Sequence, residues 1–225
     1  MKTVYMSFST DLIHGGHIAI IQKAAALGEL TVGVLTDEVV ASYRRFPILS
    51  FEERVRLFEN IKGVHRVIPQ RTLSYAENLR MLKPDYVVHG DNWVSGFQRP
   101  IRDEVIQILS EYGGKLVEFP YTYKQEYEKL EKTQQEQLSI PDIRRGRLRK
   151  LLGMKPIVRI IEAHSGITGL IAEKTTVLQD GKAYQFDGMW ISSLCDSIAK
   201  GKPDIEVVDM TSRLRTIDDI MEVTT

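Results

Sequence analysis

Two histidines near the N-terminus are spaced so that they could act together on a phosphate group. His14 and His17 bracket Gly15 and Gly16, just after the apolar stretch 4–8 and at the start of a helical pattern. Side chains three residues apart on a first helical turn project to the same side. Glycines let backbone N–H groups approach a ligand, and a helix N-terminus attracts anions. These residue types in this order predict a site for a nucleoside triphosphate.

Alternating strand and helix patterns must position these histidines. Buried strands are indicated by apolar runs at 4–8, 30–35, 65–69, 84–89 and 115–119. Helices are indicated by amphipathic patterns that follow the histidines and recur at 50–58, 75–81 and 101–112. Strands separated by helices at this spacing predict an α/β fold with a Rossmann-like, doubly wound parallel sheet. Ligands of such sheets bind at the carboxyl ends of the strands, where the histidines follow the first strand.

Charge balance, cysteine count and hydrophobic segment length indicate which classes of protein this chain does not resemble. The 225 residues carry 30 Lys and Arg against 30 Asp and Glu, so the balanced charge gives no reason to expect a nucleic-acid or membrane partner. Cys195 is the single cysteine, which excludes an intrachain disulfide framework and suits a reducing compartment. No segment has the length of a transmembrane helix, and the N-terminus enters a strand without a signal sequence. We therefore expect a cytoplasmic protein that acts on small molecules.

The segment Asp11–His17 resembles the His-x-Gly-His signature of the cytidylyltransferase-like nucleotidyltransferases. The resemblance covers about the first 145 residues and includes His89–Trp93, which is similar to the family's Gly-Asp-Asp-Trp segment. It implies CTP as substrate and Mg²⁺ as cofactor. It also implies a phosphate or phosphonate monoester as acceptor, with pyrophosphate as the leaving group. An adenylyltransferase is the alternative within this class, because the signature is shared.

Site roles follow from this resemblance residue by residue. The catalytic candidates, which would stabilise or hold the phosphate oxyanions, are His14, His17, Arg45 and Lys62. The nucleotide-binding candidates are Ser7, Phe8, Ser9, Asp11, Gly16, His89, Gly90, Asp91 and Ser139. No residue is assigned as a dedicated metal ligand.

Two departures from the family pattern leave a second class of function open. Phe8 stands where the family has glycine, and the segment around Ser139 lacks the arginine and glycine of the family's closing motif. A regulatory module that binds nucleotide without turnover is therefore the alternative to an enzyme. The polar segment 121–137, just before Ser139, is interpreted either as an exposed helix or lid, or as a plain linker.

The C-terminal part resembles a different family. Glu162–Thr168 and Phe186–Leu194 are similar to the first motifs of phosphoenolpyruvate mutase, of the isocitrate lyase superfamily. The resemblance assigns a phosphoryl-binding site to Trp190, Ser192, Ser193, Leu194 and Asp204. We expect a nucleotidyltransferase domain at 1–145, a linker at 146–155 and a partial mutase-like domain at 156–225.

The mutase-like part is expected to be incomplete. Only two strand–helix units of a (β/α) barrel are indicated, and the family's Mg²⁺-binding aspartate segment is absent before Thr225. We expect a piece of a bifunctional phosphoenolpyruvate mutase/cytidylyltransferase of phosphonate biosynthesis, or a remnant of one, without mutase turnover. Its exposed strands are expected to pack against the first domain or a second copy, as in a homodimer, or to be poorly ordered.

Overall fold

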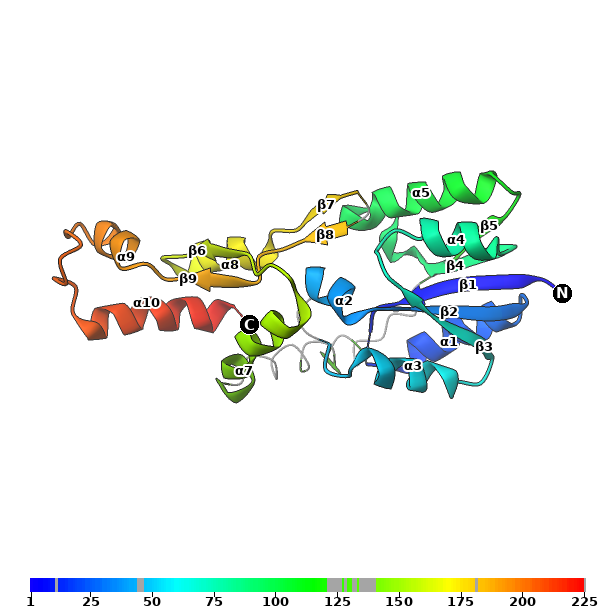
Figure 1. The fold of residues 1–225 in the computed structure, drawn as a ribbon, viewed down its shortest axis with the longest axis horizontal. Coiled ribbons are helices and arrows are strands. Elements are labelled where there is room, and N and C mark those ends of the chain that lie inside the picture. The colour runs from blue at the N-terminus through cyan, green and yellow to red at the C-terminus, as the bar shows by residue number, and fades with distance from the viewer. Residues whose placement is uncertain are drawn as a thin grey trace. The chain divides into compact units, whose positions relative to one another are not determined.

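The computed structural model describes residues 1–10, 12–43, 47–120, 127, 129–130, 133, 141–180 and 182–224. The chain forms two compact units: unit 1 is Met1–Tyr127 with Val177–Tyr184, and unit 2 is Glu128–Thr176 with Gln185–Thr225 (Figure 1). Most of the segment 121–137, interpreted above as a lid or linker, lies outside the described residues.

Unit 1 contains a five-stranded parallel sheet with the strand order β3-β2-β1-β4-β5, which confirms the doubly wound α/β fold. Its elements are β1 Thr3–Phe8, α1 Gly15–Ala25, β2 Glu29–Leu35, α2 Asp37–Tyr43, α3 Phe51–Glu59, β3 Val64–Gln70, α4 Ala76–Leu82, β4 Tyr86–Gly90, η1 Asp91–Trp93, η2 Gly96–Gln98, α5 Arg99–Ser110, β5 Lys115–Phe119, β7 Val177–Gln179 and β8 Lys182–Tyr184. The strand order reverses between β1 and β4, and ligands of such sheets bind at that switch point.

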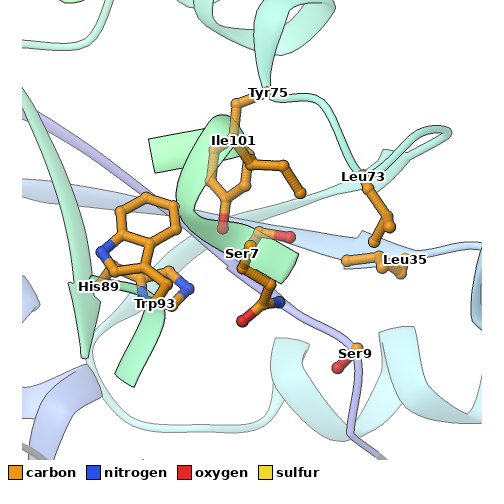
Figure 2. A pocket seen from close by; sticks show the side chains of 9 residues that line it. Ser7, Ser9, Leu35, Leu73, Tyr75, His89, Trp93 and Ile101 are labelled. Carbon is orange, nitrogen blue, oxygen red and sulfur yellow. The ribbon is translucent and has the colours of Figure 1, made fainter. Parts of the chain in front are cut away.

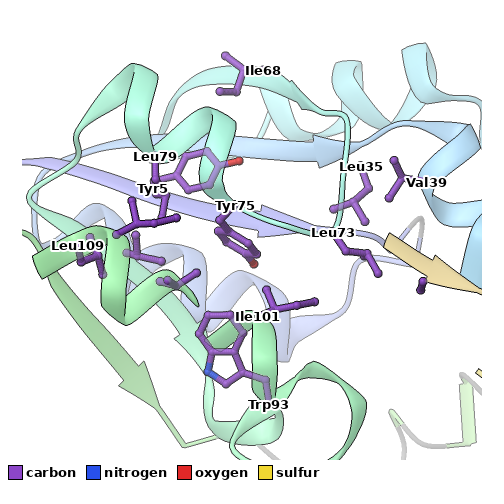
Figure 3. Packing of buried hydrophobic residues seen from close by; sticks show 14 of the residues in the cluster. Tyr5, Leu35, Val39, Ile68, Leu73, Tyr75, Leu79, Trp93, Ile101 and Leu109 are labelled. Carbon is purple, nitrogen blue, oxygen red and sulfur yellow. The ribbon is translucent and has the colours of Figure 1, made fainter. Parts of the chain in front are cut away.

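Alternate residues of β1 enter two different cores. Val4, Met6 and Phe8 pack with apolar residues of α1 and α3 on one face of the sheet. Tyr5 packs on the other face with residues of α4 and α5 (Figure 3). Because successive side chains of a strand point to opposite faces, the carboxyl end of β1 separates two surfaces that share one edge of the sheet.

A buried polar network shapes the loop that follows β3. The Tyr5 hydroxyl donates to the Gln70 side-chain oxygen, and Asn78 Nδ2 donates to Tyr5 Oη at 2.9 Å. Gln70 Nε2 donates to the carbonyls of Thr72 at 3.0 Å and Ser74 at 2.7 Å. Burial raises the pKa of the Tyr5 hydroxyl, which therefore stays protonated as a donor. Satisfied buried networks of this kind specify one geometry for the groups that they join.

Gly33 on β2 is required by this network. A Cβ on residue 33 would lie 1.9 Å from Tyr5 Oη, far inside contact distance. We expect Gly33→Ala to lower the free energy of unfolding of unit 1 by about 2 kcal/mol, because the tyrosine must leave its hydrogen bonds. Urea unfolding followed by Trp93 fluorescence, in a Trp190→Phe background, measures the loss. Tyr5→Phe removes the oxygen that a Cβ on residue 33 would meet. The double variant Gly33→Ala/Tyr5→Phe should therefore lose less unfolding free energy than the sum of the losses in the two single variants, and a loss equal to that sum would contradict this explanation.

Unit 2 contains the two strand–helix units expected from the sequence. Its elements are α7 Pro141–Met154, β6 Ile160–Glu162, α8 Gly166–Lys174, β9 Gly188–Trp190, α9 Ser193–Ala199 and α10 Met210–Val223. β6 and β9 are parallel neighbours, and a buried ion pair between Lys155 and Asp187 fixes the chain just before them. Residues 146–154, part of the expected linker, are helical in α7. Among the described helices, none combines the length and apolar character needed to cross a membrane.

Candidate functional site

The two histidines lie together at the start of α1. His14 is the N-cap residue, and its Nδ1 accepts a hydrogen bond from the Gly16 N–H at 3.1 Å. A ring nitrogen that accepts carries no proton, so the neutral imidazole of His14 carries its proton on Nε2. The rings of His14 and His17 stack with centroids 3.9 Å apart and planes 25° apart. The pair therefore forms one hydrogen-bonding surface at a helix N-terminus, where an anion is stabilised.

Aromatic rings hold this pair from two sides. Phe8 meets His17 edge to face at 5.7 Å and stacks on Phe58 at 4.8 Å. Phe8, expected among the nucleotide-binding residues, is thus a buried support for His17. Tyr127, which belongs to unit 1, stacks on His14 with the ring centroids 4.2 Å apart. This contact brings one residue of the 121–137 segment to the histidines.

A pocket opens on the opposite side of β1, at the switch point between β1 and β4 (Figure 2). The pocket is small, with a cavity volume of about 60 Å³, and part of it is open to solvent. Within the described part of the chain, the buried Ser7 Oγ has no hydrogen-bond partner, so it is available to a ligand. The lining residues are Ser7, Ser9, Leu35, Leu73, Tyr75, His89, Trp93, Gln98 and Ile101.

His89 is the pocket's fixed acceptor. Its ring stacks on Trp93 with centroids 3.7 Å apart and planes 8° apart, and its Nδ1–H donates to the Gly90 carbonyl at 2.8 Å. Burial lowers the pKa of His89, so the neutral ring is favoured and Nε2 is left as an acceptor. Trp93 is anchored in turn, because its Nε1–H donates to Glu118 at 2.6 Å. Arg102 donates twice to the same carboxylate at 2.8 Å, and these hydrogen bonds hold the pKa of Glu118 below its usual range.

The lowered pKa of His89 predicts how stability depends on pH. In the unfolded chain the pKa of His89 is about 6.5, and in the folded protein it is lower. As the pH falls, the unfolded state therefore binds a proton before the folded state does, which favours unfolding. The contribution of His89 to stability is therefore present above pH 6.5 and is lost as the pH falls toward its folded pKa. Urea unfolding of wild type and His89→Gln at pH 7.5, 6.5 and 5.5 measures this. The wild type should lose more stability than the variant between pH 7.5 and 5.5, and equal losses would contradict the assignment.

The histidine pair and the pocket share the carboxyl end of β1. Ser7 and Ser9 face the pocket, whereas Phe8 between them backs His17. The other nucleotide-binding candidates described at this edge are Gly16 in the first turn of α1, Gly90 at the end of β4 and Asp91 at the start of η1. Arg45, Asp11 and Ser139 lie outside the described residues.

Lys62 does not belong to this group. It lies exposed in the turn between α3 and β3, beside Val64, which pairs with Leu30 at the amino end of the sheet. β3 has seven residues, and at about 3.3 Å per residue the strand separates Lys62 from the carboxyl edge by about 20 Å. The structure therefore does not bring Lys62, expected among the catalytic candidates, together with His14 and His17.

The sequence reasoning missed much of the pocket. Leu73 and Tyr75 come from the loop after β3, and Gln98 and Ile101 come from η2 and α5. Gln70 is the one nearby residue that could have indicated the loop, because its buried side-chain amide donates to the Ser74 carbonyl within it. Nothing local indicates that these segments meet, because the contacts join residues far apart in the sequence.

Four of the five mutase-like residues follow one another at the carboxyl end of β9 in unit 2. Trp190 ends the strand, and Ser192 caps α9 by accepting from the Cys195 N–H at 3.3 Å. Ser193 and Leu194 form the first turn of the same helix. Asp204 lies in an exposed turn between α9 and α10. Among the described residues, no group of three His, Cys, Asp or Glu side chains is arranged to hold a metal ion in either unit.

Comparison with known proteins identifies both parts of the chain. Residues 9–146 match the family model described as cytidylyltransferase-like, and residues 148–225 match that of phosphoenolpyruvate phosphomutase. An FAD synthase of Methanopyrus kandleri is 38% identical over 84 residues, which are 36% of this chain and 56% of that protein. The ethanolamine-phosphate cytidylyltransferase of Arabidopsis thaliana is 32% identical over 40% of this chain and 23% of its own length. The glycerol-3-phosphate cytidylyltransferase of Bacillus subtilis is 32% identical over 43% of this chain and 77% of its own length.

Proposed function

Because the chain belongs to the cytidylyltransferase-like family through residues 9–146, we propose that unit 1 transfers a cytidylyl group from CTP to a phosphate or phosphonate acceptor. The observation that carries this proposal is the stacked pair of His14 and His17 at the N-terminus of α1, beside a pocket at the switch point. The matched relatives are longer than the part that this chain covers: it spans 56% of the FAD synthase and 23% of the ethanolamine-phosphate enzyme.

The reaction needs positioning and charge stabilisation more than covalent chemistry. An acceptor oxygen forms a bond to the α-phosphorus of CTP, the bond from that phosphorus to the bridging oxygen breaks, and pyrophosphate leaves with the electron pair. A phosphate or phosphonate acceptor is already ionised near neutral pH, so no general base is required. Mg²⁺ would be supplied with the substrate as the Mg²⁺ complex of CTP, since this ion prefers phosphate oxygens and water, and it would neutralise phosphate charge there.

The histidine pair supplies hydrogen bonds where negative charge develops. His14 carries its proton on Nε2 because its Nδ1 accepts from Gly16, and this proton can be donated to a phosphate oxygen. The stack with His17 and the Phe8 ring behind it fix the direction of both imidazoles. Donors that are fixed in advance stabilise the transition state without reorganisation during the reaction.

The pocket takes the organic part of the acceptor in this proposal. Ser7 and Ser9 line it from the end of β1, and His89 offers an acceptor nitrogen fixed by its Trp93 stack. The pocket and the histidine pair lie on opposite sides of β1 at the same carboxyl end of the strand. An acceptor held in the pocket can therefore direct its phosphoryl oxygen past the strand end toward the α-phosphorus of a nucleotide held by the histidines. Close positioning of two reactants accounts for a large share of the rate in such transfers.

A phosphonate acceptor is favoured by the second part of the chain. Residues 148–225 match a phosphomutase family, and a phosphoenolpyruvate mutase forms carbon–phosphorus bonds. A protein that combines the two activities would make a phosphonate in one part and activate a phosphonate in the other. Relatives that act on ethanolamine phosphate or glycerol 3-phosphate support CTP as the nucleotide.

An adenine nucleotide is the second candidate substrate, because the FAD synthase is the relative with 38% identity. A panel of CTP, ATP, UTP and GTP with Mg²⁺ and 2-aminoethylphosphonate, read by pyrophosphate release, tests both candidates. CTP should give the fastest release, and ATP as the fastest would replace CTP in the proposal. Binding of nucleotide without pyrophosphate release from any acceptor would show a regulatory module in place of an enzyme.

A further inference from the structure

A hairpin from the mutase-like part of the chain is built into unit 1. Residues 177–184 fall within the stretch 148–225 that matches the phosphomutase family, yet they belong to the same compact unit as the parallel sheet. β7 and β8 are antiparallel, with Val177 opposite Tyr184 and Gln179 opposite Lys182. Ala183 is fully buried in the same apolar core as Tyr5.

This core also forms one wall of the pocket. Ala183 shares the cluster with Leu35 and Leu73, and both leucines line the pocket. β8 packs against α2, whose Val39 and Val40 belong to the same cluster. The hairpin therefore packs against α2 and contributes to the same core as the pocket wall. A buried alanine leaves no room for a larger or charged side chain without displacing its neighbours.

We propose that the hairpin Val177–Tyr184 is a positioning element of the nucleotidyltransferase, with Ala183 as its key residue. It holds α2 and the Leu35–Leu73 wall in the geometry that the acceptor requires, and this inference rests on the proposed function of the pocket. The histidine pair starts α1, and Phe8, which contacts His17, belongs to the separate core on the opposite face of β1. Loss of the hairpin should therefore act on the acceptor and leave the affinity for CTP in place.

Paired variants on the hairpin test this directly. Ala183→Asp places a charge in the core, whereas Val177→Asp makes the same kind of change at a side chain that is 54% exposed on the same hairpin. We expect Ala183→Asp to raise the KM for 2-aminoethylphosphonate about tenfold, with the KM for CTP and kcat within about twofold of wild type. Val177→Asp should behave as wild type. Equal acceptor KM values for Ala183→Asp and Val177→Asp would overturn the proposal.

A second measurement needs no turnover and covers a variant that folds poorly. Because Val177 and Tyr184 are paired, a short Gly-Ser linker can replace residues 177–184 while joining α8 to β9. Hydrogen exchange of the intact chain should then show faster exchange in α2 and in residues 71–75, with α1 unchanged. Unchanged exchange in α2 would overturn the hairpin's role. Absence of pyrophosphate release from the wild-type chain would instead overturn the proposed function. The exchange result would still show whether the hairpin holds α2 and residues 71–75 in place.

Discussion

Removing the imidazoles of His14 and His17 is expected to lower the rate of pyrophosphate release on the order of 10²- to 10³-fold for each residue. The two rings stack at the N-terminus of α1. In the proposed reaction they would present fixed donors to the phosphates of the nucleotide. Such donors act mainly in the transition state, so the KM for CTP should change little while kcat falls. Steady-state kinetics with CTP and 2-aminoethylphosphonate measures both constants.

The choice of variant separates catalysis from folding. His14 also caps α1, so His14→Ala would remove a cap in addition to a donor, whereas the side-chain oxygen of asparagine can still accept from the Gly16 N–H. His14→Asn and His17→Gln are therefore the informative variants. His65→Ala, at an exposed position near the amino end of β3, is the matched control and should leave both constants unchanged. Equal losses of rate and nucleotide affinity would indicate a ligand-binding role for the histidines.

The second large effect is on stability. Arg54 is completely buried in α3, donates to the Leu35 carbonyl at 2.8 Å and pairs with the Asp37 carboxylate. It thereby ties the carboxyl end of β2 and the start of α2 to α3. We expect Arg54→Ala to lower the free energy of unfolding of unit 1 by about 3 kcal/mol, because it leaves Asp37 without its cation and opens a void.

An arginine two residues further on supplies the control. Arg56 lies on the exposed side of the same helix, so Arg56→Ala should change stability by less than about 0.5 kcal/mol. Urea unfolding followed by Trp93 fluorescence in the Trp190→Phe background compares the two variants. A loss for Arg54→Ala as small as that for Arg56→Ala would show that the buried guanidinium does not hold these elements together.

Local patterns predicted the elements that form the first half of the site. The apolar run at 4–8 predicted β1, and Gly15 and Gly16 between the two histidines predicted the start of α1. The amphipathic pattern at 50–58 predicted a helix, and α3 begins there with a capping box in which Ser50 and Glu53 make both hydrogen bonds. These features depend on residues within one or two turns of each other, so the sequence carries their signal directly.

The rest depends on contacts that span the chain. The pocket needs Leu73 and Ile101 beside Ser7, and no local pattern brings these residues together. Lys62 was misplaced because a motif match gives a residue's type without the edge of the sheet on which it lies. The hairpin around Ala183 was missed because its sequence continues the mutase-like part, whereas its packing belongs to unit 1.

The measurement that tests the central claim most directly is ³¹P NMR of the intact chain with CTP, Mg²⁺ and 2-aminoethylphosphonate. Cytidylyl transfer predicts the loss of the free phosphonate resonance and the growth of two coupled resonances from a cytidylyl–phosphonate anhydride, together with pyrophosphate. His14→Asn should suppress these resonances while CTP still binds. An unchanged phosphonate resonance after complete mixing with folded protein, or pyrophosphate formed with CMP alone, would contradict transfer to a phosphonate.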